Sequence, residues 1–274
     1  MQSRNPQPVC LTIAGLDPSG GAGIVADVKT FASFGCFATA AVSSVTFQNT
    51  TGVFGTVHQT GESVRKQIEP VIDDYDIAAV KTGMLPTRVI IETVAKILSV
   101  RKLRNIVVDP VVRSTSGFDL IDEPALAALI EMLFPLADII TPNIPEAERI
   151  AGIRITSMSD IERAADIMRS MGAKNVLIKG GHLPEIGGEQ LNAQGGKLVA
   201  RDLLFSDENM TAFESDFIET TATHGTGCTL AAAITANLAL RKELADAIKI
   251  AKDFVTEAIR TAPNIGRGNS PINI

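Results

Sequence analysis

Short apolar runs alternate along this chain with longer segments whose apolar residues recur at helical spacing. In residues 20–34, for example, Ile24, Val28 and Phe31 fall on one helix face. Because strand-like runs and helical segments take turns along the sequence, the pattern predicts βαβ units and a mainly parallel sheet. We therefore expect an α/β fold.

The same pattern sets the expected order of elements. Predicted strands cover residues 9–14, 36–46, 53–58, 77–80, 106–108, 139–140 and 176–178. Predicted helices cover residues 20–34, 62–73, 87–100, 123–134, 144–151, 160–171, 228–240 and 242–261. The Gly-rich stretch 183–223 contains two alternating runs, 198–205 and 211–218, which indicate antiparallel strands at a sheet edge. With no repeat and no linker, we expect one domain over 1–274, ending in an irregular, partly mobile tail.

Composition and charge exclude several classes of protein. Hydrophobic residues make up 45% and charged residues 20%, which is typical of a globular chain and not of a disordered one. The net charge is −6 and no Lys/Arg cluster interrupts it, so we expect no nucleic-acid partner. An anionic ligand would need a few placed cations, backbone N–H groups and a metal.

Cysteines and apolar runs bear on the cellular setting. Cys10, Cys36 and Cys228 are odd in number and lack CxxC spacing, so neither a disulfide framework nor a zinc site is expected. The first eight residues are unlike a signal peptide, and no apolar run reaches the ~18 residues that a membrane span needs. We expect a cytoplasmic protein with no membrane partner, and a homodimer.

A Gly-rich segment, His224-Gly225-Thr226-Gly227-Cys228, precedes an apolar helix. The first N–H groups of a helix have no internal partner, and two glycines let a ligand approach the backbone. A phosphate fits such a place, and a thiol in the first turn tends to have a lowered pKa. On spacing alone, a plain Gly-rich loop with a buried Cys is an equal alternative.

A second Gly-rich loop, residues 17–23, follows the first predicted strand. It matches neither the dinucleotide-binding GxGxxG pattern nor the P-loop, which disfavours an NAD-dependent dehydrogenase. We interpret it as a loop of close approach with Asp17 near a polar substrate group. The alternative is a turn in which Ser19 caps a helix.

Further candidates stand at predicted strand ends, the edge where open α/β sheets bind ligands. Four such ends should line one edge: 15–17, 81–83, 109–110 and 179–181. Thr46 and Gln48 share a strand face, and the Gln48 amide suits the edge of an aminopyrimidine-like ring. Glu146 could lie near Mg²⁺, although Asn143 and Glu146 also match a helix capping box.

Taken in order, these segments resemble the hydroxymethylpyrimidine/phosphomethylpyrimidine kinases of thiamine biosynthesis, over residues 9–270. The resemblance is carried by AGLDPSGGAGIVADVKTF, QNT at 48–50, KTGML at 81–85, DPVV with TSG at 109–117, TPNIPEAE at 141–148, KGGH at 179–182 and HGTGCTL at 224–230. It implies a ribokinase-like three-layer α/β/α sandwich with a mainly parallel central sheet and antiparallel edge strands. It also implies ATP as the phosphoryl donor and Mg²⁺ as the ion.

Site residues follow from the same resemblance. The expected groups are Gly225, Thr226, Gly227 and Cys228 for catalysis; Gln48, Asp17, Gly15, Met84 and Thr46 for the substrate; Lys179, Asn143, Asp109 and His224 for the nucleotide; and Glu146 and Asp109 for the metal. Cys228 stands where sugar-kinase relatives carry an Asp base, and Thr115 where some relatives have Lys. A pyridoxal or pyridoxamine kinase of the same fold and a nucleotide-binding regulator without turnover stay open as alternatives.

Overall fold

The middle layer of the molecule is one continuous sheet. The computed structural model describes residues 7–112, 119–180, 193–194, 197–207 and 209–274. Within them, ten strands run in the order β10-β9-β7-β6-β5-β4-β1-β2-β3, with β8 paired to β9. The strands are β1 (Val9–Leu16), β2 (Phe37–Asn49), β3 (Gly52–His58), β4 (Ile77–Thr82), β5 (Ile106–Val108), β6 (Ile139–Ile140), β7 (Asn175–Gly180), β8 (Ala193–Gln194), β9 (Lys197–Ser206) and β10 (Asn209–Asp216).

Strand direction confirms the predicted mixed sheet. The pairs from β2 through β1, β4, β5 and β6 to β7 are parallel. At one edge β9 and β10 are antiparallel, as the alternating runs predict. At the other edge β3 pairs antiparallel with β2 and forms a hairpin. The carboxyl ends of the parallel strands therefore meet along one side of the sheet.

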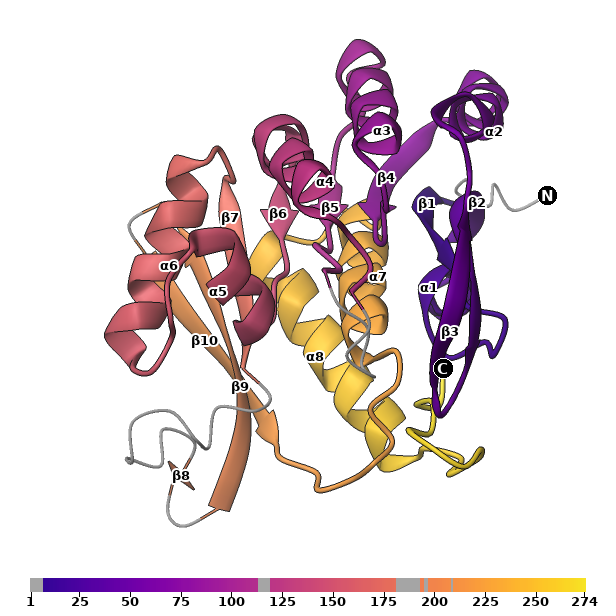
Figure 1. Cartoon of the computed structure of the whole chain (residues 1–274). Coiled ribbons are helices and arrows are strands. Elements are labelled where there is room, and N and C mark those ends of the chain that lie inside the picture. Colours follow the sequence, from indigo (N-terminus) through magenta and orange to yellow (C-terminus); the bar gives the residue numbers. More distant parts are fainter. Residues whose placement is uncertain (1–6, 113–118, 181–192, 195–196, 208) are drawn as a thin grey trace, which may run out of the picture.

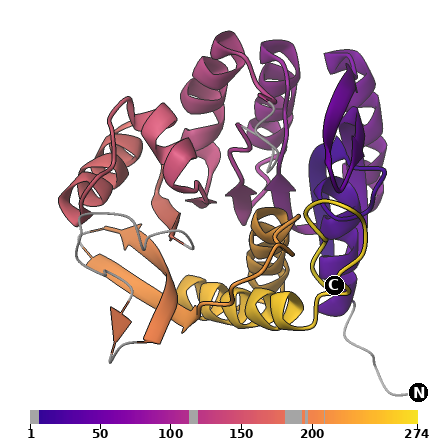
Figure 2. The same ribbon diagram turned by 60° about the horizontal axis from the view of Figure 1, so that its bottom comes forward.

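Helices cover both faces of the sheet and complete a three-layer sandwich (Figure 1). They are α1 (Gly23–Ser33), α2 (Gly61–Asp74), α3 (Arg88–Val100), α4 (Glu123–Ala128), α5 (Ile144–Ala151), α6 (Met158–Ser170), α7 (Thr226–Ala239) and α8 (Leu244–Arg260). Helices α1, α7 and α8 lie on one face and α2 to α6 on the other, and Figure 2 separates the two layers. No helix of the described part of the chain is long and apolar enough to cross a membrane.

The core is aliphatic on both faces because the central strands are buried on both sides. Ile13, Val80 and Val108 pack toward the α2–α6 layer. Val107 and Leu177 pack toward α7 and α8. This alternation is what a parallel sheet with two covered faces requires.

One local prediction needs correction, and one alternative is excluded. The helix predicted over 123–134 is α-helical only to Ala128, then continues as a π-helix (Leu129–Leu133) and a 3-10 turn (Phe134–Leu136). Pro135 has no N–H to donate and its ring crowds the preceding turn, which disfavours a regular α-helix at this point. Ser19 does not cap a helix, because α1 begins at Gly23 with Ala22 as its N-cap.

Candidate active site

A cleft of about 1210 Å³ opens at the carboxyl ends of the parallel strands. It is lined by residues from all four predicted strand ends, including Gly15, Lys81, Asp109 and Lys179. Every candidate site residue taken from the sequence lies on its wall: Gly15, Asp17, Thr46, Gln48, Met84, Asp109, Asn143, Glu146, Lys179, His224, Gly225, Thr226, Gly227 and Cys228.

The start of α7 forms one wall of the cleft. Gly225 is the N-cap, with φ 86°, and a Cβ there would lie 1.8 Å from the carbonyl oxygen of Gly21, so only glycine fits. The N–H and hydroxyl of Thr226 both donate to the Thr223 carbonyl, at 3.3 and 3.1 Å, and thereby hold the turn. A glycine N-cap offers no side chain to the first turn, so the N–H groups of Gly227 and Cys228 are the ones available to an anion.

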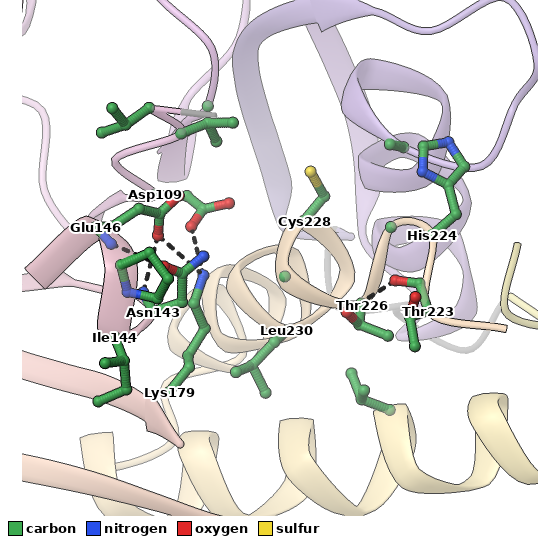
Figure 3. A pocket seen from close by; sticks show the side chains of 18 of the residues that line it. Asp109, Asn143, Ile144, Glu146, Lys179, Thr223, His224, Thr226, Cys228 and Leu230 are labelled. Carbon is green, nitrogen blue, oxygen red and sulfur yellow. Dashed lines mark hydrogen bonds and ion pairs between the residues drawn. The ribbon is translucent and has the colours of Figure 1, made fainter. Parts of the chain in front are cut away.

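A lysine and two carboxylates lie on one side of Cys228 (Figure 3). Lys179 Nζ donates to Asp109 Oδ1 at 3.0 Å and lies 3.9 Å from Glu146 Oε2. A Cβ on Gly227 would lie 3.2 Å from the same Nζ, so this cation stands directly beside the start of α7. Lys179 therefore links the carboxylates to the predicted anion site.

The pKa values of the two carboxyl groups are shifted in opposite directions. Burial would raise the pKa of Asp109, but Lys179 and Lys81 together hold it below its ordinary value. Burial raises the pKa of Glu146 to about 7, against the opposing effect of Lys179 and with the charge of Asp109 adding to the rise. The pKa of Lys179, which burial would lower, is raised by Asp109 and Glu146. The cleft thus holds one carboxyl group, Asp109, that is ionised at neutral pH and one, Glu146, that titrates close to pH 7.

Glu146 has a structural role as well. Asn143 Oδ1 accepts from the Glu146 N–H at 2.9 Å, and Glu146 Oε2 accepts from the Asn143 N–H at 2.8 Å. This is the capping box that the spacing predicts. The box fixes the Glu146 carboxyl at the mouth of the cleft, so capping and a functional role are compatible.

Mg²⁺ is implied by the family resemblance, and the donors present allow a test of fit. Among the described residues, no group of three or more His, Cys, Asp or Glu side chains could hold a metal alone. Protein-bound Mg²⁺ usually takes one or two carboxylates and completes its shell with waters and substrate phosphates. Asp109 and Glu146, both within 4 Å of one lysine nitrogen, supply such a pair. The donor set therefore fits an ion shared with a bound phosphate chain.

At the other end of the cleft, Asp17 organises its own loop. Its Oδ1 accepts from the Ser19 N–H and hydroxyl, and its Oδ2 accepts from the Ala22 N–H and lies 2.7 Å from His224 Nε2. Burial raises its pKa, but the bonds from His224 and Ser19 bring it below the ordinary value. Glycine in this loop leaves space for a neighbouring side chain of the protein, since a Cβ on Gly21 would lie 2.3 Å from the His224 ring.

The candidate substrate residues gather at the same end. Thr46 Oγ1 donates to Gln48 Oε1 at 3.1 Å, which confirms that the two share a strand face. Met84 is buried, and its sulfur would lie 3.0 Å from a Cβ on Gly15. His224, grouped with the nucleotide residues from the sequence, instead lies 3.4 Å from Gln48 Nε2 and on the opposite side of Cys228 from Lys179 (Figure 3).

A buried ion pair under the cleft was missed by sequence reasoning. Lys81 Nζ donates to both carboxylate oxygens of Asp27, at 2.8 and 2.9 Å, and both side chains are fully buried. Thr12 Oγ1 donates to the same carboxylate at 2.6 Å. A signal was present, because Asp27 stands on the apolar face of its helix and Lys81 ends an apolar strand. Charges at such positions require a partner.

The environment of Cys228 differs from the expectation for a helix start. Burial raises the pKa of its thiol to about 11; Lys81 and the Gly23 N–H oppose the rise, while the carboxylates of Asp109 and Asp27 add to it. The lowered pKa that the helix N-terminus suggests is therefore wrong for Cys228. Buried carboxylates and lost hydration outweigh the partial charge of the helix.

A known protein family matches nearly the whole chain. The family model described as phosphomethylpyrimidine kinase matches residues 17–273. The chain belongs to this family. A hydroxymethylpyrimidine/phosphomethylpyrimidine kinase from Haemophilus influenzae is 45% identical over 96% of this chain and 95% of its own length.

Two solved structures show the same fold. The phosphomethylpyrimidine kinase of Clostridium difficile superposes with a TM-score of 0.78 and is 40% identical, covering 92% of this chain and 100% of that one. The ADP complex of Bacillus subtilis pyridoxal kinase gives 0.84 at 35% identity, covering 97% of each chain. Phosphomethylpyrimidine and pyridoxal kinases thus share this ribokinase-like architecture.

Proposed function

We propose that this kinase transfers the γ-phosphoryl group of ATP to 4-amino-5-hydroxymethyl-2-methylpyrimidine, and then to the monophosphate that results. The observation that carries the proposal is one cleft with two chemically distinct ends. Gln48, Met84 and Asp17 line one end, and Lys179 with the start of α7 lines the other. Family membership with close relatives of this name supports the same activity.

The ring end selects the substrate. Gln48 offers its amide to the pyrimidine edge, with Thr46 fixing the amide from behind. Met84 packs against the ring beside Gly15, where the absence of a side chain leaves room for it. His224, which the sequence placed with the nucleotide residues, belongs to this end, because its hydrogen-bond partner is Asp17.

The phosphoryl end needs positioning and charge neutralisation more than covalent chemistry. The N–H groups of Gly227 and Cys228 receive the transferred phosphoryl, while Gly225 and Thr226 hold the turn that presents them. Lys179 and Asn143 face the nucleotide phosphates. Asp109 and Glu146 would hold Mg²⁺, which when bound offsets the charge of those phosphates.

The transfer itself makes one bond and breaks one. The hydroxymethyl oxygen bonds to the γ-phosphorus, the bond to the β–γ bridging oxygen breaks, and ADP leaves with that oxygen. The hydroxyl proton needs an acceptor as this bond forms. Cys228 can accept it only as a thiolate, and burial raises the pKa of its thiol to about 11, so the proton otherwise passes to an oxygen of the transferred phosphoryl group. The second transfer uses an acceptor oxygen that is already ionised, so it depends on the anion site alone.

An ADP-release assay tests the proposal. The purified chain with Mg²⁺ and ATP is given the hydroxymethylpyrimidine, its monophosphate or pyridoxal, and kcat/KM is compared. We expect both pyrimidines to exceed pyridoxal by at least about tenfold, the discrimination that roughly 1.4 kcal/mol of pocket contacts provides. Preference for pyridoxal, or ATP binding without ADP release, contradicts the proposal.

Pyridoxal phosphorylation is the second candidate, because the structure superposes well on a pyridoxal kinase. The same assay measures it directly. A nucleotide-binding regulator would bind ATP and release no ADP with any of the three substrates.

Assembly and location complete the proposal: a homodimer in the cytoplasm. The β2–β3 hairpin exposes Phe47, Phe54 and Val57, with Phe54 68% accessible, which supports a second chain packing there. Light scattering in solution tests the dimer, since a monomer mass at micromolar concentration would contradict it. Fractionation of the source cells tests the location.

A further inference from the structure

The C-terminal tail, residues 263–274, crosses back over the N-terminal third of the chain (Figures 1 and 2). It is irregular, as the sequence predicts, but hydrogen bonds anchor it at several points. The Asn269 N–H donates to the Thr50 carbonyl at 2.8 Å. The Thr50 hydroxyl accepts from the Arg267 and Gly268 N–H groups at 3.2 and 3.3 Å. One residue at the tip of the β2–β3 hairpin thus receives three tail N–H groups.

At the residue after Asn269, Ser270, the tail contacts the loop before α7. The His224 N–H donates to the Ser270 carbonyl at 3.2 Å. Pro271 lies against the opposite loop, since a Cβ on Gly21 would lie 3.0 Å from the Pro271 ring. Ser270 and Ile272 are buried, each 4% accessible, and the Asn273 N–H donates to the Ala258 carbonyl at 3.0 Å. The tail is therefore packed into the structure.

The tail thus contacts the two backbone segments that carry Gln48 and His224. Thr50 follows Gln48 by two residues, and His224 is itself the tail's partner. The two side chains meet at 3.4 Å, yet they belong to separate elements at opposite ends of the sequence. The tail is a covalently continuous link between them that spans only four residues, from Arg267 to Ser270.

The number of protons available for hydrogen bonds explains why the distance between Gln48 and His224 matters. His224 Nε2 carries at most one proton, and at 2.7 Å that proton goes to Asp17 Oδ2. The Thr46 hydroxyl also has one proton, with both the Leu16 carbonyl and Gln48 Oε1 at 3.1 Å. Hydrogen bonds from these two groups therefore do not lock the Gln48 amide, so its packing against His224, at 3.4 Å, bears on which of its atoms faces the substrate ring.

We infer that the tail segment 267–271, through Thr50 and His224, is a positioning element for the ring end of the cleft. It fixes the distance between the Gln48 strand and the His224 loop, and so the orientation of the amide that selects the substrate. No tail residue contacts the reacting groups. The inference rests on the proposed function only in taking the ligand of this end to be a heteroaromatic alcohol.

Three substitutions at or beside Thr50 provide a matched test. Thr50→Val removes the hydroxyl acceptor of two tail N–H groups and keeps the shape. Thr50→Ser restores the acceptor. Thr51→Val makes the same chemical change one residue on, where the hydroxyl donates only to Asn49 within the turn.

Gly268→Ala provides a stronger perturbation. A Cβ there would lie 2.1 Å from the Thr50 carbonyl oxygen, so the tail must move away from the hairpin. For each folded variant we measure kcat and the two KM values, for the hydroxymethylpyrimidine and for ATP. Circular dichroism checks the fold.

The expected result is a split between the two KM values. Thr50→Val should raise the KM for the pyrimidine by about threefold, and Gly268→Ala by about tenfold or more, because small misplacements of positioning groups are costly. The KM for ATP should stay within about twofold in both, as should every constant of Thr50→Ser and Thr51→Val.

Two results would overturn the inference. One is an unchanged pyrimidine KM in Thr50→Val and Gly268→Ala, or in Thr50→Val if Gly268→Ala does not fold. The other is an equal rise of both KM values, which marks a general loss of structure. If the wild-type protein does not turn over the pyrimidine, the proposed function is contradicted instead. The variants are then compared by their KM for pyridoxal or, if pyridoxal is not turned over either, by their Kd for a ring ligand and for ADP.

Discussion

Buried charges at the floor of the cleft set the chemistry of single residues. The pKa of Lys81, which burial alone would lower, lies above its ordinary value because the carboxylates of Asp27 and Asp109 favour the cation. Sequence patterns located the strand end but not this pair, because the partner of a buried lysine depends on which helix packs over the strand. The prediction that Asp109 and Lys179 lie at one edge was confirmed, since parallel strands end there, and Glu146 joins them from the first turn of α5.

Removing one member of the buried pair should unfold the protein readily. Lys81→Met leaves the buried Asp27 without its cation, so folding must either bury the bare charge or protonate the carboxyl, and we expect a loss of about 3–5 kcal/mol in the free energy of unfolding. The double variant Lys81→Met/Asp27→Leu should recover most of it. Urea denaturation measures both, and a single-variant loss below about 1 kcal/mol would show that the pair is unimportant for stability.

Glu146 should make stability depend on pH. Its folded pKa of about 7 exceeds the unfolded value, so the folded state binds the extra proton between pH ~4.4 and 7. Stability therefore falls as pH rises through this window and levels off above it. Glu146→Gln should be more stable than wild type at pH 8, on the order of 1–3 kcal/mol, with little difference at pH 4. Equal stability at pH 8 would argue against the raised pKa.

At the scale of elements, α7 brings the cleft together. The sequence predicted its start to within two residues, 228 against the observed Thr226, because Gly and an apolar run mark helix boundaries. It did not predict that Gly225 packs against the Gly21 carbonyl, since that contact joins loops some two hundred residues apart. The expectation that a thiol in the first turn of a helix has a lowered pKa was also wrong, because it leaves out the carboxylates packed near Cys228.

Alkylation kinetics test the thiol at the start of α7. Cys10 and Cys36 are buried, so Cys228 is the cysteine open to a reagent. With a pKa of about 11, its reaction with iodoacetamide at pH 7 should be about a hundredfold slower than that of a free thiol, and should still rise above pH 10. A rate that levels off near pH 8 would show a lowered pKa and restore Cys228 as a ready base.

Over the whole molecule, the continuous sheet and its two helical layers place chain segments that are far apart in sequence around one cleft. We propose that residues 1–274 form a single domain, which a single calorimetric unfolding transition would support and two separate transitions would contradict. Alternating periodicity was sufficient to predict the mainly parallel sheet and the antiparallel strands β9 and β10, whereas the three-layer sandwich was implied by the family resemblance. The path of the tail could not be predicted, because irregular backbone carries no periodic signal and its bonds depend on the finished fold.

The central claim is that phosphoryl transfer depends on the backbone N–H groups at the start of α7. The most direct test is kcat of Gly225→Ala with both pyrimidine acceptors, because its Cβ would collide with the Gly21 carbonyl at 1.8 Å and turn the N–H groups away. We predict a fall of at least about a hundredfold with both acceptors, comparable to the loss of an oxyanion-hole donor. Cys228→Ala, which removes a protonated thiol and keeps the backbone N–H groups, should lose much less activity than Gly225→Ala with either acceptor. A folded Gly225→Ala protein that binds ADP normally and keeps wild-type kcat would contradict the account.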